Sequence, residues 1–437
     1  MSTTVLNSQS CQSLADWLCY IEQSHPVHQI ELGLERVHAV AARAGLQHLP
    51  GKKVLIAGTN GKGTTACCIE QLLLAQGKTV GVYSSPHLLQ FNERLRLNGQ
   101  DVADADWVAA FAFVEALRQD IALTYFEFTT LVAFRLLQQQ SPEYCLIEVG
   151  LGGRLDATNI ISPDISVITT IDLDHQDWLG NDRDSIGREK AGVFRAGGIA
   201  IIGELNLPQS VLHKAAELAC KTVLVQRDYH YQNHYQNHYG QQYLQQQQSW
   251  QWQGVSQQFD QLPVPALPIQ NAACSLAVLE QLNMLPSPQQ LCSVLAGLTL
   301  AGRMQWLQQQ PAIIVDVAHN PQSARYLAQQ LLLLKPRFRR ILALVGMLKD
   351  KDIEQTLLPL TPLFEQWHLV SLKGVRGATA EQLDKVLALH GVVTQLHEDT
   401  QSAYQQLQQR LQSDELLVVF GSFITVSAVL SCHQEAK

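Results

Sequence analysis

The chain has 437 residues, of which 46% are hydrophobic and 16% are charged, with a formal net charge of −8 at pH 7. This length exceeds what one hydrophobic core usually serves, so two domains are expected. The composition is that of a soluble globular protein, and the negative net charge disfavours a general nucleic-acid binder, which would present a basic face.

The first residues lack the basic and apolar regions of a secretory signal, and no apolar run is long enough to cross a bilayer. The nine cysteines are scattered and form no C-x-x-C pair, which indicates free thiols rather than a zinc site or disulfide framework. We therefore expect a cytoplasmic protein with neither membrane nor nucleic-acid partners.

Apolar segments alternating with helical patterns predict a doubly wound α/β sheet in the first two-thirds of the chain. Helices are expected at Thr65–Gln76 and Thr129–Gln139. The expected strands are Val54–Ala57, Thr79–Tyr83, Cys145–Val149, Ile165–Thr170 and Ile199–Ile202.

A polar insertion is expected near residues 226–258, where Gln, Asn, His and Tyr predominate and the tetrapeptide Tyr-Gln-Asn-His occurs twice in succession. Such a composition favours an exposed hairpin that buries little surface. Its histidines at 230, 234 and 238 have the spacing of one helix face, but the repetitive surroundings disfavour a metal site.

A helix is expected near Asn271, and we place the domain boundary near Leu300, which gives domains 1–300 and 301–437. The second domain alternates again and predicts a smaller, Rossmann-like α/β fold. Its expected strands are Ala312–Val317, Arg340–Val345, Gln366–Ser371, Val392–Leu396 and Leu416–Phe420.

The most informative segment, Val54–Thr65, reads V-L-I-A-G-T-N-G-K-G-T-T. A strand, a glycine-rich turn and a helix N-terminus together form a concave anion site suited to nucleotide phosphates. Lys62 is expected at the β/γ-phosphates, and a hydroxyl of Thr64 or Thr65 near Mg²⁺. The match to G-x-x-x-x-G-K-[ST] is imperfect, since Ile56 replaces the first glycine and Gly63 the hydroxyl residue, so an ordinary glycine turn is the alternative.

Two further positions suit a magnesium site. Ser85 follows the second strand, where its hydroxyl is either an Mg²⁺ ligand or a cap before a proline turn. Glu148 stands near the end of the apolar strand L-I-E-V, where a carboxylate is costly to bury unless it is paired or bound to a metal. Its alternative partner is Arg154.

The segment T-I-D-L-D-H-Q-D-W-L-G places His175 among carboxylates just after another strand, either as a metal ligand or as a turn residue. Lys190 follows on a short helix, and taken alone it has the pattern of a solvated surface lysine. In the second domain, Asp316 lies within an apolar strand, and Arg303 upstream offers a phosphate-binding guanidinium.

Taken together, these motifs resemble the folylpolyglutamate synthase family of the Mur ligase superfamily, and within it the bacterial bifunctional dihydrofolate synthase/folylpolyglutamate synthases. The resemblance extends from about Leu14 to Val426. The motifs that carry it, in chain order, are G-T-N-G-K-G-T, Y-S-S-P-H-L, E-V-G-L-G-G-R-L-D-A-T-N, D-H-Q-D-W-L-G, G-R-E-K-A-G, D-V-A-H-N-P and R-G-A-T-A.

The resemblance implies a P-loop, Mur-ligase-type ATPase domain with a parallel sheet and a smaller Rossmann-like domain. It also implies ATP-dependent ligation of L-glutamate to dihydropteroate and to reduced folates through an acyl phosphate, with two Mg²⁺ ions, by a monomer that acts on small molecules. A Mur-type muramyl peptide ligase is the alternative, but Lys62 lies too near the N-terminus for its additional domain. An ATP-hydrolysing binding module is a second alternative, disfavoured by the second α/β domain.

The resemblance also implies a role for individual residues. Lys62, His175 and Lys190 are implied to be catalytic, with Lys190 carbamylated so that it supplies an oxygen ligand to a second Mg²⁺. The implied metal ligands are Ser85, Glu148, His175 and Lys190. The implied ATP contacts are Gly61, Lys62, Gly63, Thr64, Asn271, Arg303 and Asp316. The implied pterin contacts are His25, Thr124 and Asp156, although the loop that carries His25 has an extra residue relative to close relatives.

Overall fold

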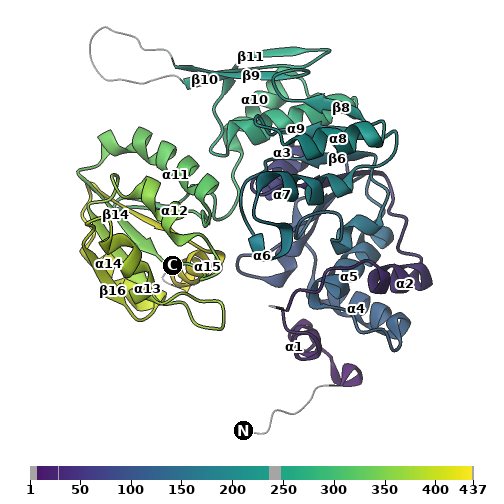
Figure 1. Ribbon diagram of the computed structural model, residues 1–437, viewed down its shortest axis with the longest axis horizontal. Helices are drawn as coiled ribbons and strands as arrows, with labels where there is room; N and C mark the ends of the chain where they lie inside the picture. The colour runs from purple at the N-terminus through teal and green to yellow at the C-terminus, as the bar shows by residue number, and fades with distance from the viewer. Residues whose placement is uncertain (1–6, 28, 236–247, 436–437) are drawn as a thin grey trace. The chain divides into compact units, whose positions relative to one another are not determined.

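The computed structural model describes residues 7–27, 29–235 and 248–435, and its chain divides into two compact units (Figure 1). The first unit comprises Met1–His87, Phe91–Ile171 and Leu179–Leu298. The second comprises Leu88–Gln90, Asp172–Trp178 and Thr299–Lys437. Each unit is built on a largely parallel sheet with helices, which confirms the α/β fold class. Within the described ranges, no helix is both long and apolar enough to cross a membrane.

The first unit contains an eight-stranded sheet in the order β4-β3-β2-β5-β1-β6-β7-β8. Strands β2 and β5 to β8 run parallel with β1, while β3 and β4 form an antiparallel edge. Strands β2, β5 and β6 are buried throughout, as expected for a parallel sheet covered on both faces. The bounds are β1 Lys52–Ala57, β2 Val80–Tyr83, β3 Leu95–Leu97, β4 Gln100–Asp101, β5 Tyr144–Glu148, β6 Ile165–Ile168, β7 Ile199–Ile202 and β8 Lys221–Leu224.

Three helices of this unit begin at a capping box that the sequence supplies. Ser13, Thr124 and Ser287 each form a capping box with the residue three positions later. The α-helices are α1 Leu14–Ser24, α2 Glu35–Ala44, α3 Lys62–Leu74, α4 Asp104–Arg118, α5 Tyr125–Gln140, α7 Arg183–Lys190, α8 Gln209–Glu217, α9 Ile269–Gln281 and α10 Pro288–Gly297, while α6 Gln176–Leu179 lies mostly in the segment that belongs to the second unit. The 3₁₀ turns are η1 Ser8–Ser10, η2 Phe91–Arg94, η3 Ala157–Ile160 and η4 Ala191–Val193.

The polar insertion forms a three-stranded antiparallel sheet in the order β11-β10-β9, with β9 His230–Tyr235, β10 Gln248–Gln253 and β11 Gln258–Pro263. The expectation that this segment buries little is wrong, because Trp250 and Trp252 are fully buried and Tyr229 is nearly so. The two tryptophans are two residues apart on one strand and therefore share a face.

The proposed helical spacing of the three insertion histidines is not realised. His230 and His234 lie on strand β9, where residues four apart share a face at a much greater separation than on a helix, and His238 lies outside the described residues. Among the residues that the structure describes, no group of three or more His, Cys, Asp or Glu side chains is placed to hold a metal ion.

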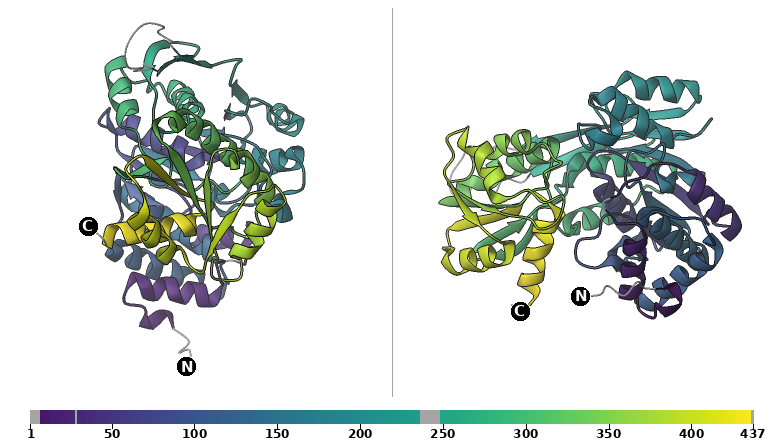
Figure 2. Two further views of the ribbon diagram at one scale, coloured as in Figure 1. Left: turned by 90° about the vertical axis from the view of Figure 1, so that its left-hand side faces the viewer. Right: turned by 60° about the horizontal axis from the view of Figure 1, so that its bottom comes forward.

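The second unit contains a six-stranded sheet in the order β12-β13-β17-β14-β15-β16, parallel except for the edge strand β12 (Figure 2). The strand bounds are β12 Gln305–Gln309, β13 Ala312–Val315, β14 Arg340–Val345, β15 Gln366–Val370, β16 Thr394–His397 and β17 Glu415–Phe420. The helices and 3₁₀ turns are α11 Pro321–Leu334, η5 Lys335–Arg337, α12 Ile353–Leu357, η6 Leu358–Leu360, α13 Ala380–Ala388, α14 Thr400–Arg410 and α15 Phe423–Glu435.

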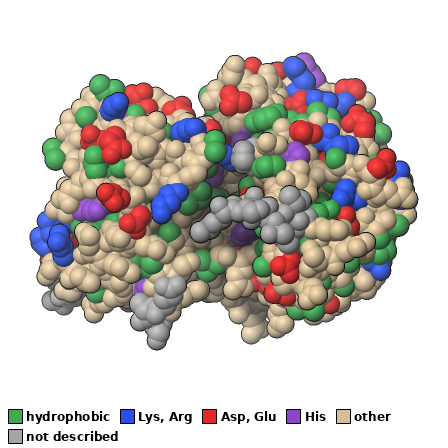
Figure 3. Space-filling view, turned by 90° about the horizontal axis from the view of Figure 1, so that it is seen from below, with side chains coloured by type: hydrophobic (Ala, Val, Ile, Leu, Met, Phe, Trp, Pro, Cys, Tyr) green, Lys and Arg blue, Asp and Glu red, His purple; other side chains and the backbone are tan. Residues whose placement is uncertain are grey.

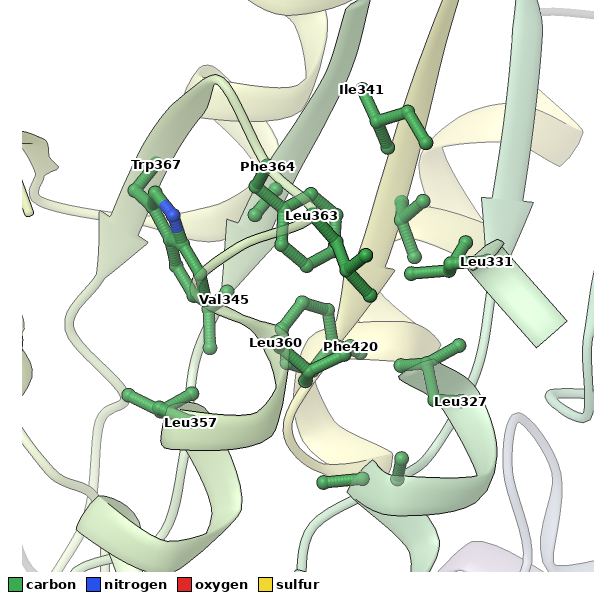
Figure 4. Close-up of a cluster of buried hydrophobic side chains, with 14 of the residues drawn as sticks. Leu327, Leu331, Ile341, Val345, Leu357, Leu360, Leu363, Phe364, Trp367 and Phe420 are labelled. Carbon is green, nitrogen blue, oxygen red and sulfur yellow. The ribbon is translucent and has the colours of Figure 1, made fainter. Parts of the chain in front are cut away.

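Alternate residues of these strands face two separate apolar clusters. Figure 4 shows the first cluster, in which the Phe364 and Phe420 rings stack with centroids 5.6 Å apart and Trp367 meets Phe364 edge-on at 5.0 Å. The second cluster, on the other face, includes Tyr404 of α14 and also Leu88, which comes from the segment after β2. The second unit is thus completed by residues that precede it by more than two hundred positions.

Charged side chains are dispersed over the surface. On the face drawn in Figure 3, Lys and Arg side chains are interspersed with Asp and Glu side chains. The face in this view is therefore of mixed charge.

Candidate active site

The phosphate-loop sequence forms the expected strand, turn and helix, running from β1 through Gly58–Gly61 into α3. The turn is tied to the end of β6: the Thr59 amide donates to the Thr170 carbonyl (2.8 Å), and the Asn60 amide donates to Thr170 Oγ1 (3.0 Å). Gly58 allows this approach, because a methyl group there would lie 1.9 Å from Thr169 Oγ1. The loop is therefore held in shape by the neighbouring strand.

The N-terminus of α3 is left open for an anion. Its cap residue, Gly61, has a left-handed backbone (φ 84°) and no side chain, so no side-chain cap covers the first amides of the helix. Lys62 lies across the loop, with Nζ donating to the carbonyls of Gly58 (3.0 Å) and Thr59 (3.3 Å). Thr65 Oγ1 is buried and has no hydrogen-bond partner among the described groups. These features fit a polyphosphate.

Glu148 faces this helix from the adjacent strand. It is the last residue of β5, which pairs with β1, and a methyl group on Gly63 would lie 3.4 Å from Glu148 Oε2. The alternative partner, Arg154, instead pairs with Glu189 (Nη2 to Oε1, 3.0 Å). Ser85 follows β2, the other neighbour of β5. The two proposed metal ligands, Ser85 and Glu148, therefore stand at the carboxyl ends of adjacent strands.

Asn271, from a distant part of the chain, lies against the phosphate loop. It lies in the first turn of α9, is almost fully buried, and its Oδ1 is only 2.6 Å from where a methyl group on Gly61 would stand. Helix α9 packs on α3, with Ser275 Oγ donating to the Thr65 carbonyl at 3.2 Å. The structure thus brings together the phosphate loop, Glu148 and Asn271 within one unit.

Lys190 is buried, with 3% of its surface exposed, so its generic interpretation as a solvated lysine is wrong. It is the last residue of α7, against the loop that follows β5: the Arg154 amide donates to the Glu189 carbonyl at 2.9 Å. A methyl group on Gly153 would lie 3.0 Å from the Lys190 carbonyl. A buried lysine beside a carboxylate-bearing loop differs from an ordinary surface cation.

The three residues implied in pterin binding have visible local roles. Asp156 is buried and accepts bonds from the Leu151 and Thr158 amides at 2.8 and 3.0 Å, and its burial raises the pKa of the carboxyl group. Thr124 caps α5 through the Glu127 amide. His25 ends α1, with Nε2 3.5 Å from a carboxylate oxygen of Glu31.

In the second unit, Asp316 follows β13 and accepts from the amides of Met304 and Ala318, both at 2.8 Å. Burial raises the pKa of Asp316, while the nearby Arg303 guanidinium opposes that rise. Arg303 also lies over the Phe423 ring, 5.2 Å from its centroid. The two residues implied to contact ATP from this unit are therefore neighbours.

His175 belongs to the segment Asp172–Trp178, which packs with the second unit. Its backbone has a left-handed φ of 52°, uncommon for a non-glycine residue. The carboxylate of the adjacent Asp174 accepts hydrogen bonds from Lys351 Nζ at 2.6 Å and from Asn320 Nδ2 at 3.2 Å. Burial would raise the pKa of Asp174, but the Lys351 ammonium and the neighbouring imidazoles hold it well below its usual range.

Lys351 was not predicted from the sequence; its side chain is 5% exposed, and its Nζ also lies 3.5 Å from His175 Nε2. Burial and the Lys351 charge lower the pKa of the nearby His319 to about 4, so that imidazole is neutral near pH 7. The signal was present in the run Lys349-Asp-Lys-Asp352, which stands shortly after the carboxyl end of strand β14.

The chain matches two family models in succession. Residues 56–279 match the Mur ligase middle domain, and residues 302–423 match the Mur ligase glutamate ligase domain. An Escherichia coli (strain K12) dihydrofolate synthase/folylpolyglutamate synthase is 42% identical over 97% of this chain and 96% of its own length. The chain belongs to the dihydrofolate synthase/folylpolyglutamate synthase family of Mur ligases.

Solved structures of that family have the same fold. A bifunctional folylpolyglutamate synthase/dihydrofolate synthase with Mn, AMPPNP and L-glutamate bound is 44% identical, with a TM-score of 0.88 over 99% of this chain and 100% of that one. Escherichia coli FolC in complex with DHPP and ADP is 40% identical, with a TM-score of 0.90 over 98% of this chain and 99% of that one.

These matches confirm the resemblance and the Mur-ligase-type fold, and they identify the chain as an ATP-dependent ligase. The muramyl peptide ligase alternative is related at the level of the superfamily, whereas the relatives above belong to the dihydrofolate synthase/folylpolyglutamate synthase family over nearly their whole length.

Proposed function

We propose that this chain joins L-glutamate to dihydropteroate and to reduced folates, using ATP to convert the acceptor carboxylate into an acyl phosphate. One observation carries the proposal: the open N-terminus of α3 faces both a carboxylate, Glu148, and an amide, Asn271, from separate elements. Such a site offers donors to phosphate oxygens and an acid for a divalent cation. The relatives with AMPPNP, Mn and L-glutamate, and with DHPP and ADP, support it.

In this proposal, the amides from Gly61 to Thr64 and the Lys62 ammonium hold the triphosphate. Lys62 is already close to the loop carbonyls of Gly58 and Thr59 and needs only to turn toward the anion. Mg²⁺, when bound, would neutralise phosphate charge, with Glu148 and Ser85 as its protein ligands. The acceptor carboxylate and the phosphate are both anions, so attack requires this cationic surrounding.

Lys190 is proposed as a carbamate that supplies an oxygen ligand to a second divalent ion, and His175 is proposed as a further metal ligand. The side chain is buried, and an ammonium buried beside a metal ion would be repelled, whereas a carbamate carries oxygens and a negative charge. Carbamate formation consumes CO₂ and the neutral amine and releases one proton. The Arg154 amide donates to the Glu189 carbonyl, so α7, which ends at Lys190, contacts the loop that follows Glu148.

The remaining roles are distributed over both units. Arg303 and Asp316 are proposed to contact ATP, and His25, Thr124 and Asp156 to contact the pterin. Asp156 suits this role because its carboxyl group is buried, has a raised pKa and is held in place by the Leu151 amide. The enzyme is proposed to act as a monomer in the cytoplasm, a compartment that suits its nine free cysteines.

The decisive experiment measures ADP release by the purified enzyme with Mg²⁺, ATP and L-glutamate, offering dihydropteroate, tetrahydrofolate or a nucleotide-linked muramyl peptide in turn. We expect turnover with both pteridines, dependent on glutamate, and none with the muramyl peptide. Glutamate-independent ADP release would indicate a simple ATPase, and turnover with the muramyl peptide alone would overturn the proposal. Turnover with one pteridine alone would overturn the bifunctional part of it.

A further inference from the structure

The hairpin formed by β10 and β11 is hydrogen-bonded to helix α9 near both ends of the helix. Near the start of the helix, Trp252 Nε1 donates to the Ala273 carbonyl at 3.1 Å. Near its end, the Glu280 carboxylate accepts the Ser256 amide at 2.7 Å, the Ser256 hydroxyl at 2.6 Å and the Val255 amide at 3.2 Å. The hairpin turn therefore holds α9 by two separate polar attachments.

These attachments are buried and closely fitted. Trp252 is fully buried, and Glu280 is 8% exposed. A methyl group on Gly254 would lie 2.3 Å from the Trp252 ring and 2.6 Å from Glu280 Oε2, so the turn has no room to shift between them. The Phe259 ring packs on Trp252 with centroids 6.0 Å apart. A buried hydrogen bond in such packing fixes the position of the helix rather than merely adding stability.

The other side of α9 meets the phosphate loop. Asn271 Oδ1 approaches Gly61, and Ser275 Oγ donates to the Thr65 carbonyl of α3 at 3.2 Å. Asn271 lies only two residues before Ala273, whose carbonyl accepts the Trp252 hydrogen bond. Both residues belong to the N-terminal turn of α9. Any movement of that turn away from the hairpin would change the distance between Asn271 and the loop.

We propose that Trp252 is a positioning residue for the nucleotide, acting through α9 to hold Asn271 against the phosphate loop. Trp252 itself contacts no substrate in this assignment. The inference rests on the proposed contact between Asn271 and ATP, and it gives the insertion sheet a function in nucleotide affinity. Loss of one neutral hydrogen bond changes an equilibrium by about twofold to tenfold, which sets the size of the expected effect.

The chain supplies a matched control in Trp250. It lies on the same face of the same strand and is equally buried, but its Nε1 donates to the Pro263 carbonyl within the hairpin, at 3.0 Å. Trp252→Phe and Trp250→Phe therefore remove the same donor from the same sheet, and only the first loosens α9. Trp252→Met, which also lacks the donor but fills space adaptably, replaces Trp252→Phe should that variant not fold.

We expect Trp252→Phe to raise KM for ATP about twofold to tenfold, with kcat and the KM for glutamate changed less than KM for ATP. The increase in Tm on adding ADP, measured without turnover, should be smaller in Trp252→Phe than in wild type, in proportion to the rise in KM for ATP. Trp250→Phe should leave both quantities near wild type, even where it lowers the Tm of the free protein by a similar amount. Equal effects of the two variants, or no effect of either, would overturn the proposal.

Asn271→Ala separates this inference from the assignment on which it rests. If Asn271→Ala leaves KM for ATP unchanged, the proposed ATP contact itself is wrong. If Asn271→Ala raises KM for ATP and Trp252→Phe does not, the contact stands and the positioning role is overturned. In the positioning role, Trp252→Phe adds little to the effect of Asn271→Ala, because both act on one contact.

Discussion

Glu148 and Gly63 face each other so closely that a methyl group on the glycine would lie 3.4 Å from the carboxylate oxygen Oε2. The carboxylate ends strand β5, and the glycine opens helix α3, so the acid points at the position where the phosphate loop would hold an anion. A carboxylate that faces a bound phosphate would repel it unless a cation lay between them, so we propose that Glu148 is a metal ligand.

Glu148→Gln is expected to reduce ligation by at least roughly 100-fold, because an amide binds Mg²⁺ more weakly than a carboxylate does. Part of the lost ligation activity should be recovered at high Mg²⁺ concentration. Steady-state ADP release over a Mg²⁺ titration measures both. Glu143→Gln, which alters an exposed pair with Lys78, serves as the control and should behave like wild type. High activity that is indifferent to Mg²⁺ would make Glu148 structural.

Lys62→Ala is expected to abolish detectable ligation, a loss of at least roughly 1000-fold, while the far-UV circular dichroism and Tm stay near wild type. Within the described part of the chain, the side chain donates to two loop carbonyls, at 3.0 and 3.3 Å, so its removal costs the fold little. Lys78→Ala is the matched surface control. Turnover near the wild-type rate in Lys62→Ala would remove the phosphate-loop assignment.

Lys190→Ala is expected to be nearly inactive and to recover partly when a short carboxylic acid fills the space, because the acid replaces the carbamate oxygens. Wild-type activity should also fall when CO₂ and bicarbonate are stripped at low pH, and return when they are restored. Activity assays with added acetate or formate test the first point. A fully liganded structure with an unmodified amine at Lys190, or an active Lys190→Ala variant, contradicts the carbamate.

Acid should destabilise the second unit through a buried histidine pair. His368 Nδ1 and His397 Nε2 are 3.0 Å apart, and burial followed by the neighbouring imidazole lowers the pKa of His368 to about 4. Because the unfolded chain binds this proton near pH 6.5 and the folded chain does not, stability is lost as pH falls from about 6.5 toward 4. His368→Gln should flatten this decline.

Urea unfolding at pH 7.5, 6.0 and 5.0 measures the effect in the wild type and in His368→Gln. The variant should be less stable than wild type at pH 7.5, because a buried imidazole pair is lost, but its midpoint should fall less between pH 7.5 and 5.0. The pKa values of His87 and His319 are also lowered to about 4, so the decline is reduced rather than removed. Parallel pH dependence in the two proteins would contradict this assignment.

Much of the fold follows from local patterns. The strands Ile199–Ile202 and Arg340–Val345 were predicted with their observed bounds, because short apolar runs between turn signals leave little choice of structure. The phosphate loop was predicted as strand, turn and helix, because its glycines and lysine act within a dozen residues. Helix α5 was predicted to begin too late, although Thr124 and Glu127 form a capping-box pattern that the sequence shows.

What could not be predicted depended on distant residues. The insertion was judged by its polar composition, whereas Trp250 and Trp252 are buried on one face of strand β10, and Trp252 bonds to α9. The burial of Lys190 depends on the loop after β5, some forty residues earlier in the chain. The approach of Asn271 to Gly61 spans more than two hundred positions and left no local pattern to find.

The position of Asp172–Trp178 and Leu88–Gln90 in the second unit has a consequence for how that unit is assembled. A fragment that begins at Thr299 would lack Asp174 and leave Lys351, 5% exposed, as a buried charge without its carboxylate. It would also lack Leu88 from an apolar cluster. During synthesis both short segments leave the ribosome well before their packing partners exist. The second unit therefore depends for its complete packing on two segments that lie far earlier in the chain.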